Sequence, residues 1–192
     1  MPAASLPWRA DMPLLPLITE RLELRLLTLA DAPAAFEIYG DPEVMRHVAG
    51  GTLPDVPATE AMIQQVIAHQ RMHGYSWWGV IERATGELVG DAGLYSYEGT
   101  GPDVEVGYTF RRDAWGRGYA TEAATACLQA AFGPLELERV VAVVKPENPA
   151  SRRVLEKIGM RADGQVRYRG EDWLRFVAER RTWRAADGAR AA

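Results

Sequence analysis

Residues 114–122, Ala-Trp-Gly-Arg-Gly-Tyr-Ala-Thr-Glu, form a glycine-rich stretch whose order of residue types suits anion binding. The strand-like run Val104-Glu-Val-Gly-Tyr-Thr-Phe110 precedes it, and a helical pattern from Tyr119 to Phe132 follows it. Glycines let the backbone turn tightly and approach a ligand closely. The free N–H groups of a helix's first turn point at negative charge placed there. The spacing therefore predicts that this loop holds a phosphorylated small molecule.

Other reactive residue types point to no second site. Cys127, the single cysteine, lies on the apolar stripe of the helix after the loop, where we expect a packed structural residue rather than a nucleophile. His69 and His73 are four residues apart, but no third ligand accompanies them, so we predict no metal. No Gly-Lys-Ser/Thr follows the glycines, which excludes a nucleotide-binding P-loop.

Size and charge bound the class of protein. The chain has 192 residues, 47% of them hydrophobic, which favours one domain with a substantial core. The formal net charge of −4 provides no basic field that would indicate a nucleic-acid partner. One cysteine excludes an internal disulfide and fits a cytoplasmic location. We see neither a signal peptide nor an apolar run that could span a bilayer, so we expect no membrane association.

The elements that must position the loop are predicted from periodicity and from turn residues. Residues 1–17 read as an extended leader, 18–184 as one mixed α/β (α+β) domain, and 185–192 as a disordered tail. The expected strands cover 22–26, 77–82, 87–97, 104–110, 140–144, 165–169 and 173–181, and the expected helices cover 34–39, about 59–74, 119–132 and 148–158.

Three segments together resemble the GCN5-related N-acetyltransferase (GNAT) superfamily, in its RimJ/RimL-like branch. They are Thr19–Arg25 with its downstream Gly40-Asp-Pro42, Val104–Tyr108 leading into Trp115–Ala123, and Asn148–Met160. The match runs from about residue 18 to residue 183. It implies a central mixed, mostly antiparallel and splayed sheet flanked by helices. It also implies acetyl-CoA as co-substrate, an amine as acceptor and no metal.

The pyrophosphate loop of the superfamily reads Gln/Arg-x-x-Gly-x-Gly/Ala. Trp115, Gly118 and Ala120 take its first, fourth and sixth positions here. Tryptophan is usual in the branch, but it cannot supply the polar first contact, so the backbone amides of 116–120 must carry the phosphates. The resemblance also places the pantetheine arm against 108–110. The expected cofactor-binding residues are Tyr108, Thr109, Phe110, Arg112, Gly116, Arg117, Gly118, Tyr119, Ala120, Asn148, Ser151 and Arg153.

Acetyl transfer from a thioester to an amine needs a neutral amine, a group that accepts its proton, and N–H donors for the oxyanion. Glu105 is the candidate base, because strand alternation can point it into the splay and burial would raise the pKa of its carboxyl. The alternative is a solvent-facing carboxylate paired with an arginine. Glu98 and Asp91 are fallback bases.

Ser151 is the candidate proton donor for the leaving thiolate. Many superfamily members carry a tyrosine where this chain has Leu155, and the resemblance implies that the serine four residues earlier replaces it. Helix capping is the alternative role for Ser151, and the two roles are compatible. The expected burial of Cys127 favours direct attack in a ternary complex over a covalent acyl-enzyme.

The acceptor is not named by any motif. One of the adjoining Trp77 and Trp78 is expected inside the core and the other at the acceptor site. The resemblance favours a protein N-terminal α-amine or a small primary amine as acceptor, and a homodimer as assembly. Two other functions stay open here: a CoA-binding regulatory module without catalysis, and a dinucleotide-binding oxidoreductase suggested by Gly116-Arg-Gly118.

Overall fold

The computed structural model describes residues 14–99 and 101–184 and places eight strands in one sheet. The sheet order is β1-β2-β3-β4-β5-β6-β8-β7, and within the described residues only β5 and β6 pair in parallel. The predicted mixed, mostly antiparallel sheet is therefore confirmed. The strands are β1 (Leu17–Ile18), β2 (Leu22–Arg25), β3 (Trp77–Glu82), β4 (Leu88–Ser96), β5 (Val104–Phe110), β6 (Arg139–Val144), β7 (Arg161–Tyr168) and β8 (Glu171–Glu179).

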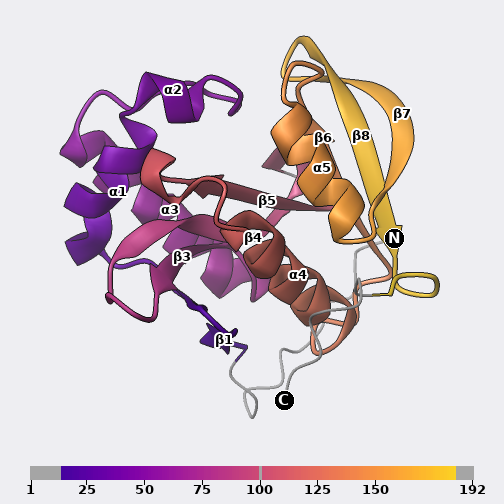
Figure 1. The fold of residues 1–192 in the computed structure, drawn as a ribbon, viewed down its shortest axis with the longest axis horizontal. Coiled ribbons are helices and arrows are strands. Elements are labelled where there is room, and N and C mark those ends of the chain that lie inside the picture. The colour runs from indigo at the N-terminus through magenta and orange to yellow at the C-terminus, as the bar shows by residue number, and fades with distance from the viewer. Residues whose placement is uncertain (1–13, 100, 185–192) are drawn as a thin grey trace.

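The helices pack on the sheet and on one another. Figure 1 shows α4 and α5 on the side of the sheet that faces the viewer, α1 and α2 at the left, and the β7–β8 pair at the right. α4 packs on β4 and β5, while α1 packs on α3. The helices are α1 (Ala32–Tyr39), α2 (Pro42–Met45), α3 (Val56–His73), α4 (Tyr119–Phe132) and α5 (Pro149–Lys157).

The helix ends follow from local sequence. Asp41, Asp55 and Asn148 cap α2, α3 and α5 through their side chains, and a proline follows within each first turn. Gly74 ends α3 in the left-handed conformation at φ 76°. α4 differs from these three helices, because its N-cap is a glycine and no side chain caps it.

The sheet opens between its fifth and sixth strands. β5 pairs with β6 only at Val104 and Glu105, opposite Val140 and Val141. Beyond that point β5 continues to Phe110 and β6 to Val144 without pairing with each other. The expected splay therefore begins next to Glu105. Backbone groups of β5 on that edge are left without a strand partner, as a bound chain-like ligand requires.

Most predicted elements form, with bounds that differ by a few residues, such as α3 beginning at Val56 rather than about 59 and β8 at Glu171 rather than 173. The short strand β1 and the one-turn helix α2 were not predicted, and β7 begins at Arg161 rather than 165. A two-residue strand has no readable period, and α2 follows the Asp41-Pro42 pair that we read only as a helix stop. Of the expected leader and tail, 1–13 and 185–192 lie outside the described residues, whereas Leu17 pairs with β2. No helix within 14–99 and 101–184 is both long and apolar enough to cross a membrane.

Candidate active site

Two cavities meet in the splay of the sheet. One, of about 390 Å³, extends toward α1–α3 and the β7–β8 pair, and we call it the acceptor-side cavity. The other, of about 540 Å³, extends along the glycine loop and α5, and we call it the donor-side cavity. Six residues line both: His47, Val48, Tyr108, Thr109, Asn148 and Ser151. A ligand in either cavity therefore reaches the same six residues.

The donor-side cavity ends at a helix start built for an anion. Gly116 and Gly118 have φ of 75° and 83°, a region in which other residues are strained. Gly118 is also the N-cap of α4, and because no side chain caps this helix, the N–H groups of its first turn are available to a ligand. The loop thus offers backbone donors and a helix dipole where a phosphate would lie.

Asn148 and Ser151 begin α5 at the other wall of this cavity. The Asn148 side chain accepts a hydrogen bond from the Ser151 backbone N–H at 3.0 Å, so Asn148 is the N-cap and Ser151 is not. The Ser151 hydroxyl is then free for a second role. It lies 2.9 Å from the Tyr108 hydroxyl, which also lies 3.1 Å from the Ser151 carbonyl oxygen.

Glu105 lies in the acceptor-side cavity at the point where the splay begins. Burial raises the pKa of its carboxyl to about 7, although the Tyr168 hydroxyl donates a hydrogen bond to it at 3.3 Å. Because side chains alternate along β5, Glu105 and Tyr108 point to opposite faces of the sheet. The carboxyl therefore serves one cavity, and the paired hydroxyls of Tyr108 and Ser151 lie where the two cavities meet.

Aromatic rings form one wall of the acceptor-side cavity. The Trp77 indole crosses Gly107, where an added Cβ would come within 2.7 Å of its Cη2 atom, so only glycine allows this placement. Trp77 stacks on Tyr95 with ring centroids 5.5 Å apart, while Tyr95 stacks on His69 at 3.7 Å. Trp78 is fully buried, as expected for one member of the tryptophan pair.

A second carboxyl in this cavity belongs to Asp91. Its side chain is buried and accepts a hydrogen bond from the Tyr39 hydroxyl at 2.8 Å. Burial raises the pKa of this carboxyl to about 7. Asp91 faces Thr109 across the β4–β5 ladder, whereas Glu105 faces Tyr95, so the two acids lie four register positions apart. The acceptor side therefore holds two separated carboxyls and no cluster.

Two of the predicted phosphate-binding arginines have their side chains elsewhere. Arg112 lies 3.8 Å from Asp41, and Arg117 donates a hydrogen bond to Glu82. Neither is among the residues that line the donor-side cavity, whereas Arg153 is. The remaining predicted cofactor residues line that cavity: Tyr108, Thr109, Phe110, Gly116, Gly118, Tyr119, Ala120, Asn148 and Ser151.

Three features of the site escaped sequence reasoning. We assigned Tyr108 a backbone role, and its side chain instead approaches Ser151, 43 residues away. Tyr39 approaches Asp91 across 52 residues, and Tyr168 approaches Glu105 across 63. Periodicity within one segment carries no signal for such contacts. The sequence offered a local signal only for Tyr108, because it lies in the strand that leads into the glycine loop.

The other reactive residues are structural. Cys127 is fully buried, and burial raises the pKa of its thiol well above the ordinary range. His69 is buried, and its Nδ1–H donates to the Tyr75 carbonyl at 2.8 Å, which leaves Nε2 to accept from Ser96 at 3.1 Å. In the part of the chain that the structure describes, no group of three or more His, Cys, Asp or Glu could hold a metal ion.

Comparison with known families decides between the readings of this cleft. Residues 21–161 match the family model described as an acetyltransferase (GNAT) domain. The chain belongs to the GNAT acetyltransferase family. The match includes the splay, the glycine loop and α5, which line the donor-side cavity, whereas Tyr168 and Trp173 of the acceptor-side cavity lie beyond the matched residues. It favours neither a dinucleotide-binding oxidoreductase nor a module without catalysis.

Relatives and solved structures agree with this assignment. The Bacillus subtilis protein YkkB is 35% identical over 153 residues, which are 79% of this chain and 88% of YkkB. A Vibrio cholerae structure assigned as a ribosomal-protein-serine acetyltransferase is 26% identical, with a TM-score of 0.74 over 88% of this chain and 99% of its own. RimL, a ribosomal L7/L12 alpha-N-protein acetyltransferase solved with coenzyme A, shares the fold at 16% identity, with a TM-score of 0.71 over 84% and 96%.

Proposed function

We propose that this GNAT protein transfers an acetyl group from acetyl-CoA to a primary amine by direct attack in a ternary complex. The observation that carries the proposal is the meeting of two cavities at Tyr108 and Ser151, with Glu105 on one side and the glycine loop on the other. Donor and acceptor can then enter from opposite faces of the sheet and meet in the splay. Such positioning accounts for a large share of catalysis when the thioester is already activated.

The donor side fits acetyl-CoA in its chemistry. Its uncapped helix start and two left-handed glycines supply N–H donors for the pyrophosphate. The unpaired edge of β5 beyond Glu105 supplies backbone groups for the amides of the pantetheine arm. RimL, which shares the fold, was solved with coenzyme A bound.

Glu105 is the proposed base. A protonated amine must lose a proton before its nitrogen can attack the thioester carbonyl carbon, and a carboxylate with a pKa of about 7 accepts such a proton near neutral pH. The nitrogen–carbon bond forms, the nitrogen gives up its second proton to solvent, and the carbon–sulfur bond then breaks. Glu105 returns its proton to solvent. The buried thiol of Cys127 supports direct attack, because no other cysteine is in the sequence to carry an acyl group.

Ser151 is the proposed proton donor for the leaving thiolate. Its hydroxyl is not needed to cap α5, because Asn148 does so. The serine proton moves to sulfur while the neighbouring Tyr108 hydroxyl at 2.9 Å hydrogen-bonds the serine oxygen, and Ser151 then regains a proton from solvent. The products are then an amide and a neutral thiol.

The acceptor class is testable by a screen of amines with acetyl-CoA. Peptides with free N-terminal α-amines and small primary amines are incubated with the protein, and products are identified by mass spectrometry. We expect an acetylated amine and an equal amount of free CoA with at least one class. Transfer to no amine under conditions in which CoA binds would oppose the proposal.

A further inference from the structure

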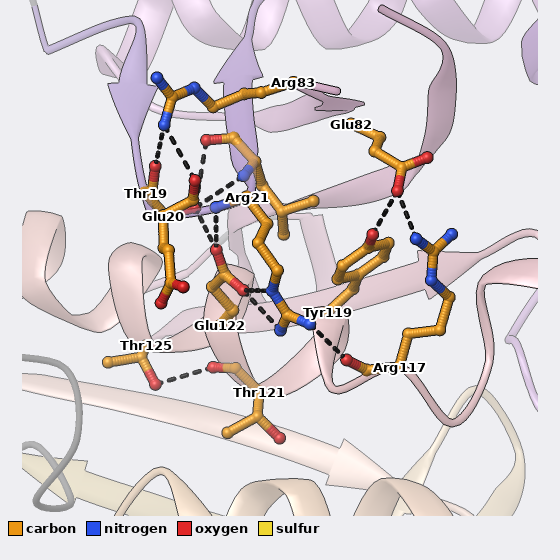
Figure 2. Close-up of polar contacts among 11 residues, drawn as sticks. Thr19, Glu20, Arg21, Glu82, Arg83, Arg117, Tyr119, Thr121, Glu122 and Thr125 are labelled. Carbon is orange, nitrogen blue, oxygen red and sulfur yellow. Dashed lines mark hydrogen bonds and ion pairs between the residues drawn. The ribbon is translucent and has the colours of Figure 1, made fainter. Parts of the chain in front are cut away.

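Hydrogen bonds and ion pairs connect the glycine loop to the first strands of the sheet. Figure 2 shows four charged side chains that make this connection. Arg21 follows β1, Glu82 ends β3, Arg117 lies in the loop, and Glu122 lies in the first turn of α4. All four lie outside the set of residues that line the donor-side cavity. They form what we call the loop clamp.

Arg21 holds the loop and the helix together. Its Nη1 donates to the Arg117 carbonyl oxygen at 2.8 Å, and its Nε donates to Glu122 Oε2 at 2.7 Å. The Arg21 backbone N–H donates to Glu122 Oε1 at 2.8 Å. Its Nη2 lies 3.4 Å from the position of a Cβ on Gly118. One guanidinium therefore fixes the carbonyl before Gly118 relative to the helix that Gly118 begins.

Glu82 holds the other side of the loop. Its Oε1 accepts hydrogen bonds from the Tyr119 hydroxyl and from Arg117 Nη2. The hydrogen bond from Tyr119 lowers the pKa of the Glu82 carboxyl, which keeps it ionised. The guanidiniums of Arg21 and Arg117 lie 4.7 and 4.6 Å from the centroid of the Tyr119 ring. Tyr119, the first residue of α4, is thus held through contacts to both its ring and its hydroxyl.

The charges of the loop clamp balance. Two guanidiniums face two carboxylates, so the clamp adds little net positive charge beside a phosphate. The loop clamp must then contribute to anion binding through the positions of the backbone groups that it holds, and not through its charge. Backbone N–H groups recognise a phosphate only when they point at a common centre, and a glycine loop has no side-chain packing of its own to hold them there.

We propose that Arg21 and Glu82 are positioning residues for the donor: they hold the backbone amides of 116–120 in the arrangement that binds the pyrophosphate. This inference rests on the proposed function, because it assumes that the loop binds CoA. It assigns the Thr19–Arg21 segment, more than 90 residues before the loop in sequence, a part in cofactor affinity.

Binding of CoA and of pantetheine, which is the same arm without the nucleotide and its phosphates, separates this role from general stability. Isothermal titration calorimetry gives both dissociation constants without an acceptor. We expect Arg21→Ala to weaken the affinity for CoA about tenfold and to leave the affinity for pantetheine unchanged. A tenfold loss corresponds to the free energy of one or two charge-assisted hydrogen bonds. Glu82→Gln keeps the shape of the side chain and is expected to lose about threefold for CoA alone.

Arg83→Ala is the matched control. Arg83 donates to the carbonyl oxygens of Thr19 and Glu20 at 2.8 and 2.9 Å, so it braces the same turn without touching the loop. We expect it to leave the ratio of the two affinities unchanged. Thermal unfolding of each variant checks that it folds. If the Arg21→Ala variant does not fold, the CoA and pantetheine affinities of the Glu82→Gln variant test the inference.

The outcomes are distinct. An unchanged CoA affinity in the folded Arg21→Ala and Glu82→Gln variants would overturn the inference. Equal losses for CoA and pantetheine would overturn it as well, because a clamp for the pyrophosphate loop has no reason to affect the arm. Wild-type protein that binds neither CoA nor pantetheine would instead contradict the proposed function, and the clamp with it.

Discussion

The donor and acceptor sides of the cleft are built in different ways. The donor side comes from three short runs of sequence, 43–48, 108–121 and 147–157, and the groups that its helix start offers a ligand are backbone amides. The acceptor side combines side chains from α1, β3, β4, β5 and β7, including Tyr39, Trp77 and Tyr168. Backbone recognition depends on conformation, whereas side-chain recognition depends on residue identity. We therefore expect changes on the two sides to affect different kinetic constants.

The largest effect is expected from Glu105→Gln. The amide cannot accept the amine's proton, so kcat for acetyl transfer should fall about 100-fold, while the dissociation constant of CoA stays unchanged. Glu98→Gln is the matched control, because this nearby exposed acid affects Glu105 only through its charge. Steady-state kinetics with calorimetry of CoA binding measure both. Equal activity of the Glu105→Gln variant and the wild type would remove Glu105 from the mechanism.

The pH profile sharpens the same assignment. Glu105 accepts a proton only when ionised, and its pKa is about 7, so kcat/KM for the acceptor should rise with pH through 7. The acceptor's own ionisation persists in Glu105→Gln, and the difference between the two profiles isolates the carboxyl. Folding raises this pKa from 4.5, so Glu105 should lower the stability of the protein as pH rises from about 4.5 to 7. Identical profiles would contradict the assignment.

Gly118→Ala tests the backbone character of the donor side. Its φ of 83° strains any residue with a Cβ by about 1 kcal/mol, and a shifted loop should weaken CoA about tenfold. Gly170→Ala has a similar φ of 85° in the β7–β8 turn, with no atom near the added Cβ. We expect it to lose the same stability and no CoA affinity, as measured by thermal unfolding and calorimetry. Weaker CoA binding in both variants would mean that the loss of CoA affinity comes from lower stability of the protein and not from the shape of the glycine loop.

Trp77→Ala tests the acceptor side and should have the smallest effect. Removing the indole that crosses Gly107 takes away one aromatic wall, so KM for the acceptor should rise about fivefold. The affinity for CoA should stay unchanged, because Trp77 lines only the acceptor-side cavity of the two. Trp77→Phe should retain most of the acceptor affinity. A loss of CoA affinity as large as the rise in KM for the acceptor would contradict the separation of the donor side from the acceptor side.

The contrast between the sides also explains what could be predicted from sequence. On the donor side, the parts from 108–120 and 148–153 were predictable because strand, glycines, helix start and Asn148 are local patterns, each with its own conformational signal, whereas the wall from 43–48 was not predicted. Glu105 was predictable as a candidate because alternation in β5 limits where it can point. Its partner Tyr168 was not, because that contact depends on how β7 folds back over the splay. Arg117 was assigned to phosphate by its position in the loop, and its pairing with Glu82 requires knowledge of β3.

Single turnover with labelled acetyl-CoA and an excess of protein tests the direct transfer most directly. Without an amine, the label should remain on CoA, and the mass of the protein should stay unchanged. With an accepted amine, the label should move to that amine, and an equal amount of free CoA should appear. Label on the protein itself before the amine is added would contradict direct attack in a ternary complex.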